Sequence, residues 1–115
     1  MMTQQEFEQY ILSFDGVWLD YPFGEDTAVY KYGQAPEGKI VALVEQGSRP
    51  VRVSLKCDSQ LAKVLRERYE SVLPATMVNK KYWNTIICSG QLSQDEVFDL
   101  ARLSYQIVKD DQTKE

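Results

Sequence analysis

Three strand-like segments separated by short turns limit the folds that this chain can adopt. Segments 28–32, 39–45 and 51–56 are rich in β-branched and apolar residues, and the turns between them, 33–38 and 46–50, each contain a proline. Turns of this length cannot hold the crossover that a parallel pair of strands needs. The sequence therefore predicts an antiparallel meander.

The second and third strands differ in how they are expected to be covered. The run 40–44 is apolar throughout, as in a strand that is buried on both faces. Segment 51–56 instead alternates between apolar and polar residues, so one of its faces is expected to lie open. The apolar positions are Val51, Val53 and Leu55, and the polar positions are Arg52, Ser54 and Lys56.

Three helices are expected around this meander. Thr3-x-x-Glu6 and Ser93-x-x-Glu96 are capping boxes, each followed by apolar residues at helical spacing. A helix between them is predicted to begin at Asp58 or Ser59. These patterns place a helix at each end of the chain and one after the meander.

Two further strands, near 75–78 and over 82–88, complete the order α-β-β-β-α-β-β-α. The predicted fold class is α+β, with a single antiparallel sheet and helices packed on one face. Residues 1–115 are expected to form one domain with a polar, frayed tail at 110–115. Segment 15–26 is expected to be a loop whose aromatic residues cover the core.

Several classes of chemistry lack the residues that they need. The chain has no histidine, which removes the usual metal ligand and the commonest general base, and no nucleotide-binding or catalytic motif is present. Cys57 and Cys88 are separated and flanked by apolar sequence, so buried reduced thiols are expected, with a disulfide as the open alternative. We therefore expect no enzyme, no cofactor and no metal site.

The termini and the hydropathy pattern point to a cytoplasmic protein with no membrane partner. No apolar run approaches the roughly eighteen residues that span a bilayer. The first residues carry neither a basic segment nor an apolar one, as a secretory signal would.

The charged residues are distributed unevenly along the chain. The net charge is −4, yet residues 27–90 contain ten bases and five acids. Residues 1–26 contain six acids and no base, and residues 91–115 contain six acids and three bases. A basic middle between acidic ends permits one basic surface on an acidic protein.

Segment 79–85 concentrates hydrogen-bonding, cationic and aromatic groups more than any other. It consists of Asn79, Lys80, Lys81, Tyr82, Trp83, Asn84 and Thr85. The lysines could neutralise phosphates, the amides could form hydrogen bonds, and Tyr82 could stack on a base. The same residues are equally compatible with a structural hairpin in which Trp83 anchors the core and the asparagines fix a turn.

Four motifs in order give the chain a family resemblance. They are Tyr21-Pro22-Phe23-Gly24, Ser54-Leu55-Lys56-Cys57-Asp58, Asn79–Thr85 and Ser104-Tyr105. With them the chain resembles the MmcQ/YjbR family from about Phe7 to Val108. The resemblance implies a small bacterial α+β protein, similar in fold to CyaY and to secretion chaperones. It also implies a DNA-binding label, which rests on a double-wing arrangement of hairpins. The family usually has a histidine where this chain has Tyr82, so a role for that histidine does not transfer.

Our first hypothesis is a non-enzymatic DNA-binding module. Its predicted binding residues are Arg52, Lys56, Asn79, Lys80, Lys81, Tyr82 and Asn84, and its predicted structural anchors are Pro22, Phe23, Trp83 and Tyr105. It requires the four cations among these binding residues to share one exposed face.

Two alternatives stay open. One is a protein-interaction or chaperone-like module that is a monomer or a weak homodimer. The other is a small-ligand pocket lined by Trp18, Tyr21, Phe23 and Trp83, which must converge on one cavity.

Overall fold

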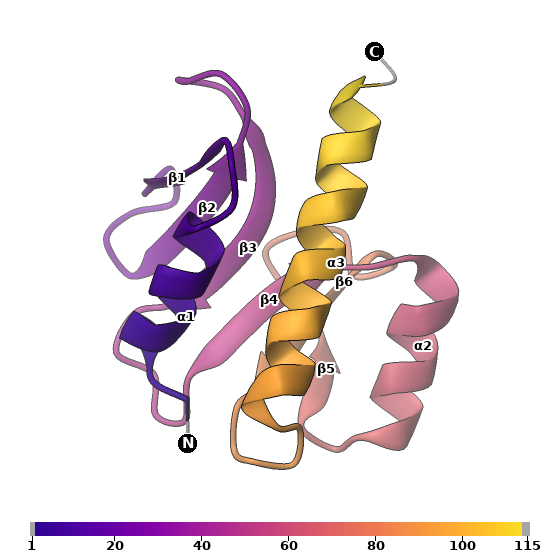
Figure 1. Ribbon diagram of the computed structural model, residues 1–115. Coiled ribbons are helices and arrows are strands. Elements are labelled where there is room, and N and C mark those ends of the chain that lie inside the picture. Colours follow the sequence, from indigo (N-terminus) through magenta and orange to yellow (C-terminus); the bar gives the residue numbers. More distant parts are fainter. Residues whose placement is uncertain (1, 114–115) are drawn as a thin grey trace.

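The expected meander forms the centre of an antiparallel sheet in the computed structural model, which describes residues 2–113 (Figure 1). Within those residues the elements are α1 (Gln4–Leu12), β1 (Val17–Asp20), β2 (Thr27–Tyr32), β3 (Lys39–Glu45), β4 (Arg52–Lys56), α2 (Ser59–Arg68), β5 (Val72–Pro74), β6 (Trp83–Ile87) and α3 (Gln94–Thr113). The spatial order of the strands is β1-β2-β3-β4-β6-β5. The α+β class, the single antiparallel sheet and the order of the predicted elements are confirmed.

The first difference from the prediction is β1, which lies inside the segment expected to be a loop. Its four residues pair with β2, from Val17 opposite Tyr32 to Asp20 opposite Val29. All four side chains are half-buried. A short edge strand of this kind shows no apolar–polar alternation, so its sequence carries no strand signal.

Two other boundaries were wrong. The strand expected near 75–78 lies three residues earlier, at β5, and residues 75–78 instead cross the face of the sheet. The tail expected to fray from residue 110 continues α3 through Thr113, and residues 114–115 lie outside the described residues. An ion pair between Asp111 and Lys56, with 3.6 Å between Oδ2 and Nζ, ties this last turn to the sheet.

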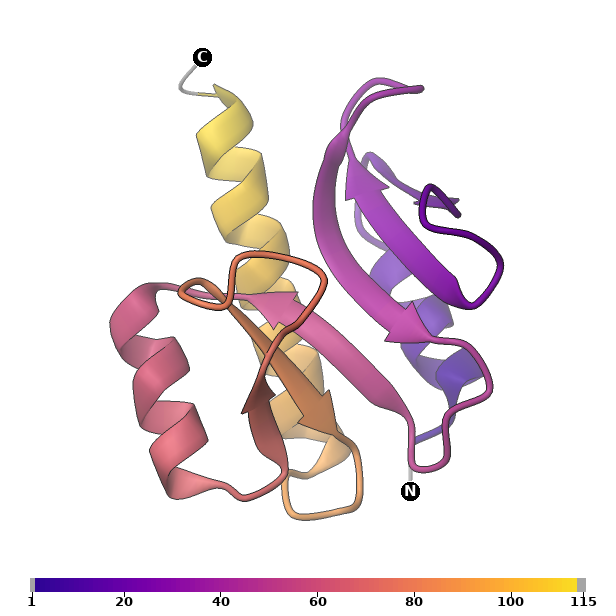
Figure 2. The same ribbon diagram turned by 180° about the vertical axis from the view of Figure 1, so that it is seen from behind.

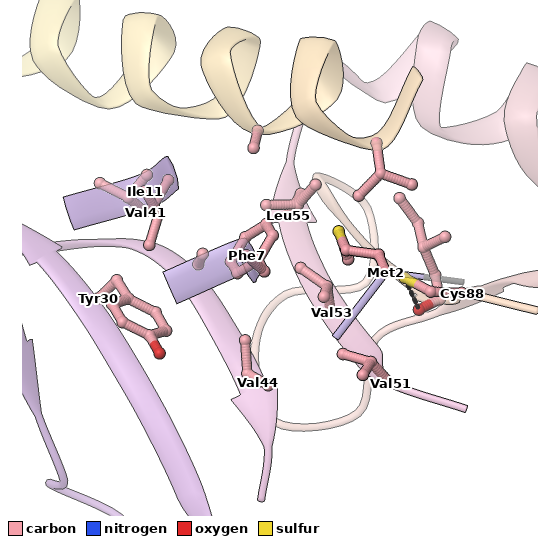
Figure 3. Packing of buried hydrophobic residues seen from close by; sticks show 14 of the residues in the cluster. Met2, Phe7, Ile11, Tyr30, Val41, Val44, Val51, Val53, Leu55 and Cys88 are labelled. Carbon is pink, nitrogen blue, oxygen red and sulfur yellow. Dashed lines mark hydrogen bonds between the residues drawn. The ribbon is translucent and has the colours of Figure 1, made fainter. Parts of the chain in front are cut away.

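The main core lies between the sheet and the helices α1 and α3 (Figure 3). Its largest fully buried side chains include Phe7, Ile11, Tyr30, Val41, Val44, Val53, Ile86 and Val97. Both capping boxes are present at the starts of α1 and α3. Among the described residues no helix is long and apolar enough to cross a membrane.

A smaller cluster lies on the opposite face of the sheet. Residues 75–82, here called the crossing loop, pass over this helix-free face (Figure 2). Beneath the loop, Val29 and Leu43 pack with Trp83, and Ala75 of the loop completes the cluster. Trp83 and Tyr105, two of the predicted anchors, are both buried.

Ser104 of α3 joins the two central strands where they separate. The β3–β4 pairing runs from Val44 opposite Val53 to Ala42 opposite Leu55 and then stops. At the next position the Ser104 hydroxyl donates to the carbonyl oxygen of Val41 at 2.6 Å and accepts from the backbone N–H of Lys56 at 3.0 Å. A fully buried hydroxyl thus satisfies two backbone groups that no longer reach each other.

Replacing this hydroxyl is expected to destabilise the protein. Ser104→Ala leaves a carbonyl and an N–H group without partners, which should lower the free energy of unfolding by about 2–4 kcal/mol. Urea denaturation followed by circular dichroism measures the change, and Ser89→Ala, at an exposed position, is the control. Equal stability of the two variants would show that the bridge is dispensable.

Candidate nucleic-acid interface

Residues 79–82 form a tight turn at the end of the crossing loop. The Tyr82 N–H donates to the carbonyl oxygen of Asn79 at 3.1 Å, and the Asn79 side-chain oxygen accepts from the Lys81 N–H at 3.0 Å. Lys80 and Lys81 are exposed, and the Lys81 ammonium lies 5.5 Å from the centre of the Tyr82 ring. The Tyr82 side chain is 38% exposed, so both lysines and one aromatic ring reach solvent from a single turn.

Asn84 does not belong to this surface, and its predicted binding role was wrong. The residue is only 2% exposed, because its side chain points from β6 into the packing against α2. Its amide nitrogen donates to the carbonyl oxygen of Ala62 at 3.1 Å, and its oxygen accepts from Arg66 at 2.7 Å. Asn84 is therefore a buried connection between β6 and α2.

This connection brings a third cation to the turn. The same guanidinium nitrogen of Arg66 that contacts Asn84 also donates to the carbonyl oxygen of Lys80 at 3.0 Å. We call Arg66, Lys80 and Lys81 the basic corner. Within the described part of the chain no carboxylate forms an ion pair with any of the three. Arg66 was not among the predicted site residues, since it lies on a different element and no local pattern shows that it faces the turn.

Arg52 and Lys56 do not extend the basic corner, contrary to the prediction. The Arg52 Nε atom lies 3.8 Å from a carboxylate oxygen of Glu45, and Lys56 pairs with Asp111 of α3. Each strand cation therefore has its own acidic neighbour, on the adjoining strand β3 for Arg52 and on α3 for Lys56. The four predicted cations do not form one continuous, unpaired basic face.

The aromatic residues proposed to line a ligand pocket do not converge either. Trp83 packs against Leu43 under the crossing loop, whereas the Trp18 ring nitrogen donates to the carbonyl oxygen of Gly33 at 2.7 Å. Tyr21 and Phe23 are exposed. The pocket hypothesis in that form was wrong.

Pro22 and Phe23 also fail as structural anchors. Both lie in the exposed loop between β1 and β2, and the Phe23 side chain is 49% exposed. The loop connects the ends of two paired strands, since the β1–β2 pairing stops at Asp20 opposite Val29, and it lies beyond the part of the sheet that covers the core.

The surroundings of the two thiols make them unreactive. Cys57 and Cys88 are both buried and free, and they lie at opposite ends of the β4–β6 pair. Burial raises the pKa of Cys88 to about 11. Burial, with the nearby Asp58 carboxylate, raises the pKa of Cys57 to about 11 as well. The described residues contain no group of three or more His, Cys, Asp or Glu side chains that could hold a metal ion.

Comparison with known proteins identifies the family. The sequence profile of the YjbR family matches residues 12–107. The chain belongs to the YjbR family. It is 28% identical over 109 residues to uncharacterized protein YjbR of Escherichia coli strain K12, covering 91% of this chain and 86% of that protein. It is 31% identical over 94 residues to uncharacterized protein YbdF of Escherichia coli O157:H7, covering 82% and 74% respectively.

Solved structures of similar proteins share the YjbR-family fold. The crystal structure of Deinococcus radiodurans protein DR2400, described as a DUF419 domain, superimposes with a TM-score of 0.88 at 28% identity, over 94% of this chain and 79% of that one. A crystal structure from Pseudomonas syringae gives a TM-score of 0.76 at 25% identity, over 93% and 99%. Family membership thus accounts for the fold and leaves the activity to be inferred from the site.

The Asn84 connection is expected to stabilise both α2 and the turn. Asn84→Ala leaves the Ala62 carbonyl and the Arg66 guanidinium without their buried partner, so we expect a loss of about 2–3 kcal/mol in the free energy of unfolding. Hydrogen exchange of α2 amides should also become faster. Asn79→Ala, at the exposed turn, is the matched control and should cost less than half as much. The connection is unimportant if both variants behave alike.

The raised pKa values predict unreactive thiols. At pH 8 a thiol with a pKa near 11 is thiolate in only about one molecule in a thousand, and burial also blocks access. In the folded protein both cysteines should react with Ellman's reagent far more slowly than glutathione. In denaturing urea both should react fully. Rapid reaction of one thiol without denaturant would contradict the buried placement.

Proposed function

We propose that the protein is a non-enzymatic module that binds DNA through the basic corner. The observation that carries the proposal is that Arg66, Lys80 and Lys81 lie together at one turn, and that no carboxylate in residues 2–113 forms an ion pair with them. The DNA-binding label that the family resemblance implies agrees with this chemistry.

The turn is held in place before any ligand arrives. Asn79 fixes its backbone, and Arg66 fixes its position relative to α2 and β6. Cations that project from a fixed backbone lose less conformational freedom on binding than cations on a flexible loop. This arrangement suits contacts to two or three neighbouring phosphates.

The exposed Tyr82 ring favours single-stranded DNA. A base can stack on this ring only when it is not paired in a duplex, and stacking is tolerant of sequence. The net charge of −4 opposes binding elsewhere on the surface. We therefore propose local, sequence-tolerant binding of modest affinity to single strands, with duplexes bound more weakly.

Fluorescence anisotropy with a labelled oligothymidylate tests the proposal. Lys80→Gln combined with Lys81→Gln should weaken binding by about tenfold or more at low salt, because two phosphate contacts are lost. The wild-type affinity should fall with a log–log salt slope of about −2, as expected for three contacts to a single strand.

The matched control removes the same charge at the strand positions. Arg52→Gln combined with Lys56→Gln should change the affinity by less than about twofold, since both cations already have acidic partners. An equal effect of the two double variants would mean that net charge, not the basic corner, governs binding. No binding of single-stranded or duplex DNA at low salt would refute the function.

A further inference from the structure

The helix-free face contains a groove that the basic corner does not use. It has a volume of about 410 Å³ and lies between the crossing loop, the edge strand β5 and the adjoining ends of β2 and β3. Its floor includes Leu43 and the hydroxyl groups of Ser54 and Thr85, which are 2.7 Å apart and bonded to each other. The floor thus offers an apolar contact beside polar groups with hydrogen-bonding capacity to spare.

The sides of the groove expose large apolar side chains. Leu73 of β5 is 40% exposed and Met77 of the crossing loop is 50% exposed, and both line the groove. The Thr27 hydroxyl donates to the Met77 sulfur at 3.8 Å. A flexible thioether facing a hollow can adjust to an apolar side chain of varied shape.

The charged residues of the groove leave it acidic. Asp26 and Glu45 line it together with a single cation, Arg52. Arg52 lies 3.8 Å from Glu45, and with Asp26 the three charged side chains leave the groove with one net negative charge. Charge complementarity therefore favours a ligand that carries a positive group.

We propose that this groove binds an extended polypeptide segment with apolar and basic side chains at alternate positions. In an extended chain, residues two apart point to the same side and lie about 6.6 Å apart. One apolar side chain would pack between Leu73 and Met77, and a lysine or arginine two positions away would approach Asp26 and Glu45. The Ser54 and Thr85 hydroxyls would contact the peptide backbone.

Binding of designed peptides tests this assignment. The probe is a fluorescein-labelled, amidated Ser-Leu-Ser-Lys-Ser-Leu-Ser peptide, and anisotropy at low salt measures its affinity. Replacing its lysine by glutamate, or both leucines by serine, should weaken binding by about tenfold or more, equivalent to about 1.4 kcal/mol. Equal binding of the glutamate peptide would overturn the proposed charge preference. Equally tight binding of leucine amide or lysine amide alone would indicate a small-molecule site instead.

Variants of the protein show whether the peptide binds in the groove. Asp26→Asn combined with Glu45→Gln should weaken binding of the lysine peptide by about tenfold, and Met77→Ser should weaken its binding as well. The charge-matched control is Glu37→Gln combined with Asp95→Asn, two exposed carboxylates outside the groove, which should leave the affinity within about twofold. If groove and control variants lose affinity equally, the peptide does not bind in the groove.

The DNA and peptide proposals fail independently. The variant that lacks Lys80 and Lys81 should keep its affinity for the lysine peptide, because neither residue lines the groove. Loss of peptide binding in that variant would overturn the groove assignment. An absence of DNA binding would leave the peptide result unaffected.

Discussion

The two halves of the sheet meet along a short seam between β3 and β4, and the hydroxyl group of Ser104 holds them together where this pairing ends. The β3–β4 pairing covers only Ala42–Val44 against Val53–Leu55, and the strands separate beyond it (Figure 1). Helix α3 lies across this seam, and Ser104 satisfies one backbone group from each strand. Nearby, the Tyr105 hydroxyl donates to the carbonyl oxygen of Asp15 at 2.7 Å, so the same turn of α3 also fixes the connection into β1. Two neighbouring residues of one helix thereby set the positions of β1, β3 and β4.

With the helices gathered on one side, the other face of the sheet is left to the crossing loop. The loop buries Trp83 and Leu43, and its two ends have different surroundings. Toward Thr76 and Met77 it forms one side of an acidic groove, whereas toward Lys80 and Lys81 it forms the basic corner. A chain with a net charge of −4 can therefore present a local positive site, because no carboxylate of the described residues forms an ion pair with Arg66, Lys80 or Lys81.

Residues with strong local signals were placed correctly from the sequence. The alternation of 51–56, the apolar run of 40–44 and the two capping boxes depend on neighbours a few positions apart, and they specified the meander and the helix starts. In segment 79–85, for which the sequence left a binding and a structural interpretation open, Trp83 is buried and Lys80 and Lys81 are exposed. The strand β1 was missed because edge pairing over four residues leaves no periodicity to detect.

The amino-acid order was sufficient to specify the fold class, the family and the absence of histidine chemistry, since each depends on composition, spacing or local propensity. Only the folded chain decided how the polar residues are used. Asn84 is equally polar in either role, and it became a buried connection because β6 turns it toward the Ala62 carbonyl on α2. Arg66 joined the lysines, while Arg52 and Lys56 met Glu45 and Asp111. These partners are distant in sequence or on separate elements, and an ion pair leaves no local pattern to read. Which charges remain free to bind a partner is therefore a property of the tertiary structure.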